Sequence, residues 1–212
     1  MEFRPFCRAD IPHVLTWFRT PAELFQWGGP KRRFPLDEAQ MAALLSETGG
    51  AQPDRRMWAG LQQGALVAMA SAVLDWDQGT ALLTMVGVAP SARGQGLAAP
   101  FLRDVLRAVF QEPEFERLEL NVYTFNTAAI LTYDALGFVR EGVRRSMARV
   151  GDERWDAAHY AMLRGDYSLG SQISIVPREG RGRNAAKSRI AQGSPVSVIR
   201  AAIWRAMGSS SG

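Results

Sequence analysis

The sequence predicts an α/β (α+β) fold, with a mixed, mostly antiparallel sheet of about seven strands and helices on both faces. Three observations predict this fold. Residues 55–88 hold three strand-like segments joined by short turns that contain glycine, which is typical of an antiparallel meander. Two strand-to-helix passages follow, over residues 80–112 and 117–136, and they indicate crossover connections. The regular periodicity then ends near Ser168.

The first part of the chain predicts one short strand and three helices. Residues 2–6 are expected to form the strand. Asp10 is expected to cap a helix over residues 11–19, because a carboxylate accepts hydrogen bonds from the free N–H groups of a first turn. The Thr-Pro-Ala-Glu start of residues 20–28 predicts a second, capped helix. Residues 36–47 predict the third helix, which glycines end.

The middle of the chain changes from helical to alternating periodicity. Residues 55–62, 65–75 and 80–88 predict three strands. A helix is expected over residues 95–112, with apolar residues along one face. Residues 117–122 predict a fifth strand.

The last part of the predicted domain contains one helix and a hairpin. Asn126 is expected to cap a helix that Gly137 ends. Residues 138–150 and 154–164 predict two further strands, joined by a turn at Gly151.

The basic charge of the chain belongs to its C-terminal end. Residues 1–164 carry 18 Lys and Arg against 19 Asp and Glu, whereas residues 165–212 carry seven against two. We therefore expect a folded domain over residues 1–167 and a basic flexible tail over residues 168–212, whose composition is typical of disordered linkers. A short amphipathic helix over residues 195–207 would form only against a partner or the domain. The tail could contact RNA or an anionic surface.

Several classes of protein are disfavoured. No apolar run reaches the length of about 18 residues that a membrane helix needs, and the N-terminus lacks the apolar core of a signal peptide, so we expect a cytoplasmic protein. Cys7 is the only cysteine, and His13 and His159 are the only histidines, so we expect no metal site. Both a monomer and a homodimer fit the composition.

Residues 86–102 pass from a strand to a helix through Arg93, Gly94 and Gly96. The start of a helix exposes unpaired N–H groups and the positive end of its dipole, and therefore attracts phosphate. Glycine lets an anion approach the backbone, and arginine pairs with phosphate oxygens. A pyrophosphate group would fit this bend.

Four interpretations of the bend remain open on these residues alone. Gly94, Gly96 and Ala99 match a dinucleotide-binding fingerprint, but the preceding strands are antiparallel and no second βαβ unit follows. A P-loop lacks its Gly-Lys-Ser/Thr ending here. The pyrophosphate of coenzyme A is the third interpretation, and an ordinary loop-to-helix turn is the fourth.

Two motifs together favour coenzyme A. Residues 88–98, V-x-P-x-x-R-G-Q-G-L-A, resemble the acetyl-CoA motif of the GNAT superfamily of N-acetyltransferases, Q/R-x-x-G-x-G/A. The next block is similar to that family's strand followed by N-x-x-A-x-x-x-Y-x-x-L-G-F, here Asn126, Ala129, Tyr133, Leu136, Gly137 and Phe138. The resemblance covers residues 2–165. The ending D-x-x-x-Y-x-M-L at residues 156–163 looks most like the branch of ribosomal-protein N-terminal acetyltransferases.

The resemblance implies an acetyl-CoA-dependent N-acetyltransferase that moves the acetyl group directly to a primary amine, either a protein N-terminus or a small-molecule amine. It implies that the fourth strand splays from the fifth, with a bulge near Gly87, and that an N–H group near Val88 stabilises the developing oxyanion. The hydroxyl of Tyr133 would protonate the departing thiolate. The implied cofactor-binding residues are Val86, Gly87, Val88, Arg93, Gly94, Gln95, Gly96, Leu97, Ala98, Asn126 and Tyr133.

The general base is less clearly indicated. Some relatives carry a glutamate on the fifth strand at the position of Asn121, and Glu119, two residues earlier, could act through a water molecule. Asp75 and Asp77 are further candidates. Because an α-amine is more easily deprotonated than a lysine, weak evidence for a base favours N-terminal or small amines. The catalytic candidates are therefore Tyr133, Glu119 and Asn121.

The acceptor pocket is expected between residues 10–47 and the last hairpin, with Trp17, Phe25, Trp27 and Trp155 available to line it. Two alternative functions remain. One is a non-catalytic module that binds coenzyme A, and the other is a protein whose basic tail docks to RNA or an anionic surface.

Overall fold

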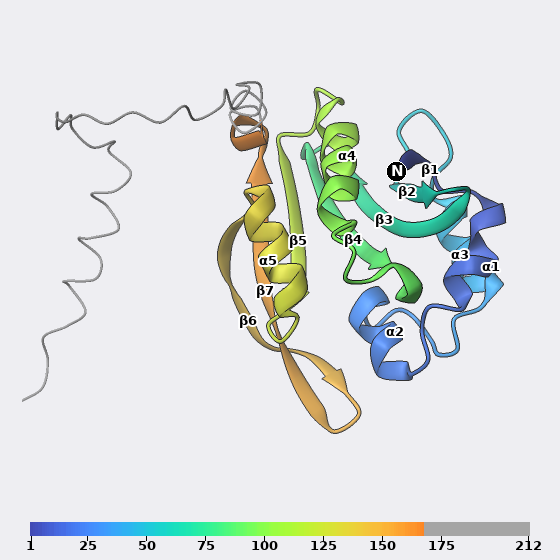
Figure 1. Cartoon of the computed structure of the whole chain (residues 1–212). Helices are drawn as coiled ribbons and strands as arrows, with labels where there is room; N and C mark the ends of the chain where they lie inside the picture. The colour runs from blue at the N-terminus through green and yellow to red at the C-terminus, as the bar shows by residue number, and fades with distance from the viewer. Residues whose placement is uncertain (168–212) are drawn as a thin grey trace, which may run out of the picture. The chain divides into compact units, whose positions relative to one another are not determined.

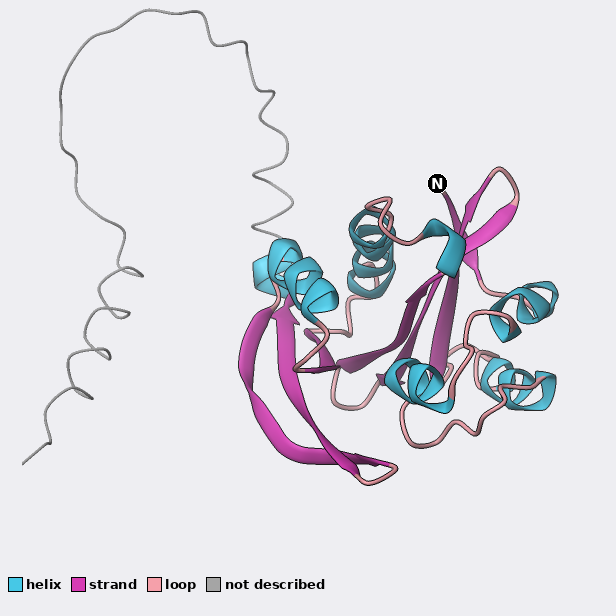
Figure 2. Ribbon diagram, turned by 60° about the horizontal axis from the view of Figure 1, so that its bottom comes forward, coloured by secondary structure: helices cyan, strands magenta, loops and turns pink. Residues whose placement is uncertain are grey.

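The computed structural model describes residues 1–167, and Figures 1 and 2 show this part as one twisted sheet with helices packed against it. The seven strands follow the order β1-β2-β3-β4-β5-β7-β6, and only β4 and β5 are parallel neighbours. The predicted fold class is confirmed. The tail over residues 168–212 and its expected helix over residues 195–207 lie outside the described residues. The strands are β1 (Glu2–Pro5), β2 (Arg55–Gln62), β3 (Ala65–Asp75), β4 (Thr80–Val88), β5 (Arg117–Tyr123), β6 (Val139–Val150) and β7 (Glu153–Leu163).

The helices cover the sheet from both sides. The helix α4 follows β4 and α5 follows β5 on one face, while α1, α2 and α3 pack on the other face near β2 to β4 (Figure 2). The helical segments are η1 (Arg8–Asp10), α1 (Ile11–Leu15), α2 (Pro21–Gly28), α3 (Glu38–Ser46), η2 (Pro90–Ala92), α4 (Ala98–Phe110) and α5 (Thr127–Leu136).

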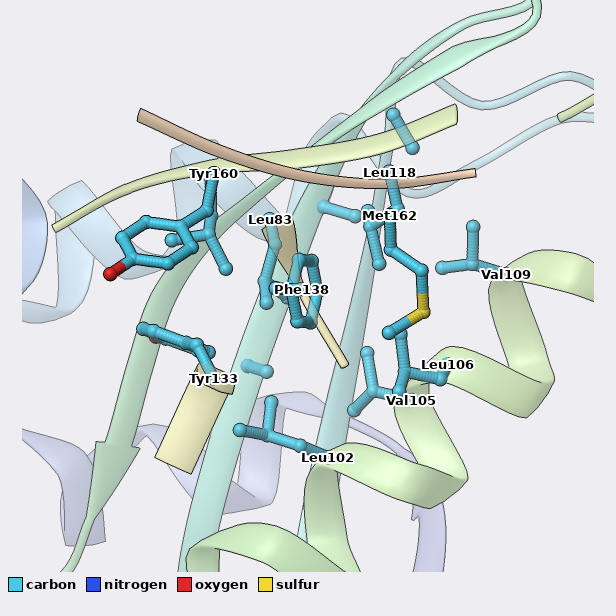
Figure 3. Close-up of a cluster of buried hydrophobic side chains, with 14 of the residues drawn as sticks. Leu83, Leu102, Val105, Leu106, Val109, Leu118, Tyr133, Phe138, Tyr160 and Met162 are labelled. Carbon is cyan, nitrogen blue, oxygen red and sulfur yellow. The ribbon is translucent and has the colours of Figure 1, made fainter. Parts of the chain in front are cut away.

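Side chains of β3 alternate between two hydrophobic cores. Ala68, Ala70 and Ala72 are buried in the core beneath α4, whereas Val67 and Met69 are buried in the core beneath α1 to α3. The three alanines leave room for large side chains of α4 to reach the sheet. Figure 3 shows the residues of α4 that point towards the sheet: Leu102, Val105, Leu106 and Val109.

The first predicted helix is shorter than expected. The helix α1 ends at Leu15 rather than at residue 19. The backbone N–H and the hydroxyl of Thr16 both donate to the carbonyl of His13, at 3.3 and 2.7 Å, and close the last turn. Trp17 then enters the core, where it is 4% exposed.

The helix α4 also starts later than expected, at Ala98 instead of residue 95. Gly94 and Gly96 have φ angles of 77° and 72°. These angles lie in the left-handed region, which an α-helix cannot contain. The glycines therefore shape a turn in front of the helix and are not part of it.

Asp10 does not cap α1 as predicted. Its carboxylate accepts two hydrogen bonds from the guanidinium of Arg4, both at 2.7 Å, and one from the backbone N–H of Cys7 at 2.9 Å. Burial raises the pKa of the Asp10 carboxyl, but the hydrogen bonds from Arg4 and Cys7 outweigh burial and leave this pKa below its ordinary value. Asp10 thus ties the start of α1 to β1.

The parallel strands β4 and β5 pair over only part of their length. Their register runs from Thr80 opposite Arg117 to Leu83 opposite Leu120. Beyond that point β4 continues to Val88 and β5 to Tyr123, and the two strands diverge towards α2 (Figure 1). The splay that the resemblance implies is therefore present.

A bulge in β4 accompanies the splay. Ala70 of β3 stands opposite two residues of β4, Met85 and Val86. Met85 has a φ of 49°, an uncommon value for a residue with a side chain. The indole N–H of Trp27 donates to the carbonyl of Met85 at 2.9 Å, which holds the bulged residue against α2.

Gly87 lies next to the bulge predicted for it, but its role is close packing. A Cβ atom at Gly87 would lie 2.9 Å from Nε1 of Trp27 and 3.2 Å from Cζ3 of Trp17. Only glycine therefore lets both indoles lie against β4.

Replacing Asp10 tests the buried ion pair. We expect Asp10→Asn to lower the free energy of unfolding by about 2 kcal/mol at neutral pH, because Arg4 loses its charged partner. A carboxyl whose pKa falls on folding stabilises the protein above its unfolded pKa of about 4, and this stabilisation is lost as the pH falls through the folded value. Urea denaturation should thus show the difference between wild type and variant shrinking as the pH falls below about 4.

Asp104→Asn, which removes an ion pair with the exposed Arg107, serves as control and should cost under about 0.5 kcal/mol. Equal losses in both variants would contradict this account.

A second substitution tests the packing at the splay. Gly87→Ala should cost about 1–3 kcal/mol, because Trp27 must move and its bond to Met85 must lengthen or break. Thermal unfolding and tryptophan fluorescence measure the two effects. Gly142→Ala on β6 is the matched control, because a Cβ there meets no atom within 4 Å. Equal losses of stability in the two variants would contradict a packing role for Gly87.

Candidate active site

A cavity of about 420 Å³ occupies the opening between β4 and β5. Its walls come from the segment around α1 and α2, from the diverging ends of the two strands, and from the first turns of α4 and α5. The residues that line it are Trp17, Phe18, Glu23, Gln26, Trp27, Leu83, Thr84, Met85, Val86, Gly87, Val88, Arg93, Ala98, Leu102, Asn121, Val122, Tyr123, Asn126, Ala128, Ala129, Thr132 and Tyr133.

The structure brings most of the predicted site residues to this cavity. Gly94, Gln95, Gly96 and Leu97 do not line it and instead form the turn that leads from η2 into α4. Glu119 does not line it either. The predicted residues in the cavity wall are Val86, Gly87, Val88, Arg93, Ala98, Asn121, Asn126 and Tyr133.

The turn before α4 presents unpaired backbone N–H groups. Within residues 1–167, the N–H groups of residues 94–98 donate no hydrogen bond, and no side chain caps α4. No atom lies within 4 Å of a Cβ built on Gly94 or Gly96, so the space in front of the turn is open. Such a set of N–H groups at a helix start is suited to bind an anion. The Nε atom of Arg93 donates to the carbonyl of Val88 at 3.2 Å, which places this cation between the turn and β4.

Tyr133 is buried on α5 at the edge of the core. Its ring packs edge-to-face on Phe138, with 5.7 Å between centroids, and Figure 3 shows it beside Leu102 of α4. Burial raises the pKa of the Tyr133 phenol well above its ordinary value.

The Tyr133 hydroxyl has no hydrogen-bond partner within the described chain. No fully buried side-chain oxygen or nitrogen there lacks a partner, so this hydroxyl must retain access to the cavity. It can therefore donate a proton to a group that enters the cavity.

Asn126 has the capping role predicted for it. Its Oδ1 atom accepts a hydrogen bond from the N–H of Ala129 at 3.3 Å at the start of α5. Its Nδ2 atom forms no hydrogen bond among residues 1–167 and is available to a ligand.

The predicted general bases lie away from the cavity. Asp75 accepts a hydrogen bond from the N–H of Gln78 in the β3–β4 turn, at the opposite end of β4. Glu119 pairs with Arg117, with 3.1 Å between Oε2 and Nε. Glu119 approaches the cavity only through His159, whose ring lies between Glu119 and Asn121.

The expected acceptor-side aromatic residues divide into two groups. Trp17 and Trp27 line the cavity. Phe25 and Trp155 pack edge-to-face at 5.7 Å, and both pack against Tyr123, which lines the cavity. Phe25 and Trp155 thus support the wall that Tyr123 forms.

The sequence did not indicate the roles that two residues have at the site. Trp27 was expected as a lining residue but not as the hydrogen-bond donor to the bulge. His159 was considered only as a metal ligand, yet it contacts Asn121. The alternation of residues along β7 can assign His159 to one face of the sheet. No signal in the sequence shows which residue of β5 lies opposite it.

Two further features are absent from residues 1–167. No group of His, Cys, Asp and Glu side chains there is arranged to hold a metal ion. None of the helices in this part is long and apolar enough to cross a membrane.

Comparisons with known proteins agree with this geometry. Residues 15–138 match the profile of the Acetyltransferase (GNAT) family. The SPbeta prophage-derived uncharacterized N-acetyltransferase YokL of Bacillus subtilis (strain 168) is 31% identical over 77 residues. This match covers 36% of the present chain and 44% of YokL, so the chain matches less than half of that relative's length.

Solved structures share the fold. Spermidine N-acetyltransferase from Vibrio cholerae, in complex with CoA and spermine, has a TM-score of 0.67 and 17% identity, over 79% of this chain and 97% of that one. Ribosomal-protein-alanine N-acetyltransferase from Brucella melitensis has a TM-score of 0.66 and 17% identity, over 77% and 99%. The ribosomal-protein-S18-alanine enzyme from Escherichia coli has a TM-score of 0.58 and 23% identity, over 76% and 92%.

At these identities the likeness to solved structures shows the fold and does not distinguish between the branches. The family profile, in contrast, covers more than half of the 212 residues and includes both the glycine turn and the helix that carries Tyr133. The chain therefore belongs to the GNAT family of acetyltransferases.

Proposed function

We propose that this protein is an acetyl-CoA-dependent N-acetyltransferase that transfers the acetyl group directly to a primary amine, either a protein N-terminus or a small-molecule amine. One observation carries the proposal. A single cavity is lined by the unpaired end of β4, by the first turn of α4 and by the side chain of Tyr133 with its hydroxyl. Family membership and the relative solved with CoA support the choice of co-substrate.

The turn before α4 is suited to hold the pyrophosphate of the co-substrate. Residues 94–98 offer their backbone N–H groups, and Arg93 adds a positive charge. In this proposal Gln95 and Leu97 contribute through their backbone. The pantetheine arm would pair with the free edge of β4 at Val86 and Val88, and with Asn126 across the cavity.

The bound thioester supplies an activated acetyl group. The nitrogen of the amine forms a bond to the carbonyl carbon, and the carbon–sulfur bond breaks. The protein must therefore stabilise negative charge on the carbonyl oxygen and return a proton to the sulfur.

In this proposal the backbone N–H of Val88 meets the first need. The N–H of Ala89 donates to the carbonyl of Val67 on β3 at 2.9 Å. Backbone groups of an antiparallel strand point alternately to its two sides, so the N–H of Val88 points away from β3 and towards the cavity. A backbone N–H in that position supports the stabilisation of an oxyanion.

In this proposal the hydroxyl of Tyr133 meets the second need. Its raised pKa keeps the phenol protonated throughout the neutral range. Burial makes the phenol a weaker acid, which opposes the transfer of its proton. Burial also destabilises a thiolate formed in the same cavity, and this effect favours the transfer of the proton to sulfur. The amine loses its own proton to solvent or to a group that acts through water, because none of the predicted carboxylates lines the cavity.

Tyr133→Phe separates catalysis from binding. We expect kcat to fall by about 100-fold or more, because the general acid is removed, while the affinity for CoA changes by less than about twofold. Thiol release and isothermal titration measure the two quantities. Tyr167→Phe is the matched control, because this ring stacks on Phe110 and does not line the cavity. An unchanged kcat would exclude the assigned role. A wild-type protein that binds CoA but releases no thiol with any amine would favour the non-catalytic module.

Gly96→Asp tests the pyrophosphate site. A carboxylate in front of α4 would repel the diphosphate, so we expect the affinity for CoA to fall by about tenfold or more. Acetyl-pantetheine lacks the diphosphate, so its turnover should change by less than about twofold. Gly64→Asp, at another glycine with positive φ and open space, is the control for backbone strain. Equal losses with CoA and acetyl-pantetheine would contradict the assignment.

A further inference from the structure

Asn121 and His159 form a side-chain pair at the wall of the cavity. The two residues stand directly opposite each other on the antiparallel strands β5 and β7. The Nδ1 atom of His159 lies 3.2 Å from Oδ1 of Asn121. Asn121 lines the cavity, whereas His159 lies one strand further away. His159 can therefore act on a ligand only through Asn121.

The surroundings of His159 indicate which ring nitrogen carries the proton. The Nη2 atom of Arg117 lies 3.4 Å from Nε2, and a guanidinium can only donate. Nε2 then accepts, and Nδ1 donates its proton to Oδ1 of Asn121. The carboxylates of Glu119 and Glu141 lie 3.4 and 3.7 Å from the same Nε2. If the ring gained a second proton at Nε2, this proton would bond to one of the two carboxylates. The hydrogen bond from Nδ1 to Asn121 would remain in place.

This pairing fixes the orientation of the Asn121 amide. Its oxygen is engaged by His159, so its NH₂ group is the free end of the side chain. That NH₂ group has no acceptor among residues 1–167, and no fully buried side-chain nitrogen there lacks a partner, so it is accessible to a ligand. An amide held in this way offers N–H donors and binds a carbonyl oxygen rather than an ammonium group.

The charges nearby agree with such a ligand. Glu119 and Glu141 both form ion pairs with Arg117, which offsets their attraction for a polycation. Among the described residues that line the cavity, Glu23 is the only acidic one, and its Oε2 atom accepts a hydrogen bond from the N–H of Arg19. A polyamine, with several ammonium groups and no carbonyl, would meet few free carboxylates here.

We propose that Asn121 donates a hydrogen bond to a carbonyl oxygen next to the acceptor amine, and that His159 is the positioning residue that holds Asn121 in this orientation. The acceptor class is then an α-amino acyl group, such as the N-terminal residue of a peptide. This inference rests on the proposed acetyl transfer and adds the class of acceptor to it.

The test compares two small amines that differ at this carbonyl. Alaninamide contains it, and 1,2-diaminopropane has a methylene and an amine in its place. The measured quantity is the ratio of kcat/KM for alaninamide to kcat/KM for 1,2-diaminopropane. Differences in the pKa of the two amines cancel when the ratio of a variant is divided by that of the wild type. We expect Asn121→Asp, which replaces the donor with a carboxylate, to lower this ratio by about tenfold or more.

Variants of His159 test the positioning role. His159→Leu leaves the Asn121 amide free to rotate and should also lower the ratio. His159→Asn places an N–H donor near the former Nδ1 and should restore most of it, which a purely structural role would not produce. His13→Leu, which removes the other histidine from an exposed position on α1, should leave the ratio unchanged. Binding of CoA reports whether each variant is folded.

The outcomes distinguish this inference from the proposed function. The protein could acetylate both amines with a ratio of kcat/KM values that Asn121→Asp does not change. This result would overturn the inference and leave the acetyltransferase proposal intact. Binding of CoA without acetylation of any amine would overturn both. Nitrogen-15 NMR of the His159 ring in the full-length wild-type protein gives a result that needs no variant. Protonated Nδ1 is expected, and a ring with a proton on Nε2 alone would exclude the pairing.

Discussion

The separation of β4 from β5 is the constraint on which the rest of the site depends. The parallel ladder stops after Leu83 and Leu120, although both strands continue. A continuous ladder would close the cavity and consume the backbone groups of β4 that face it. The bulge at Met85 and the hydrogen bond from Trp27 hold β4 on its separate course. The N-terminal helices therefore do more than cover a core, because α2 keeps the centre of the sheet open.

The groups that face the opening share one property. In the described chain every fully buried side-chain nitrogen and oxygen has a hydrogen-bond partner. The Tyr133 hydroxyl, the amide of Asn121 and the N–H groups of residues 94–98 have polar atoms without one, and all are placed where a ligand can reach them. The cavity thus concentrates hydrogen-bonding capacity that the fold leaves unused. Most of it consists of donors, which suits a ligand rich in phosphate and carbonyl oxygens.

Local signals in the sequence were sufficient for much of the fold and for half of the site. Gly94, Gly96 and Tyr133 belong to short motifs whose spacing alone carries the prediction. The strands were found because alternation and glycine turns are local features. Asp10 was misjudged because its partner Arg4 competes with the helix for the carboxylate, and this competition depends on how β1 packs. The pairing of His159 with Asn121 depends on register between strands 38 residues apart, which periodicity does not encode.

Strands normally leave backbone groups unpaired at the border of a sheet, where charged side chains and covering loops prevent them from recruiting other chains. Here such an edge lies in the middle of the sheet and faces the cavity. Its amides should exchange hydrogen with solvent faster than those of the flanking ladders, although they belong to the interior. A ligand that pairs with this edge takes the place of a missing stretch of strand. Binding and the stability of the central sheet are for this reason coupled, because a ligand that binds only the folded protein stabilises it.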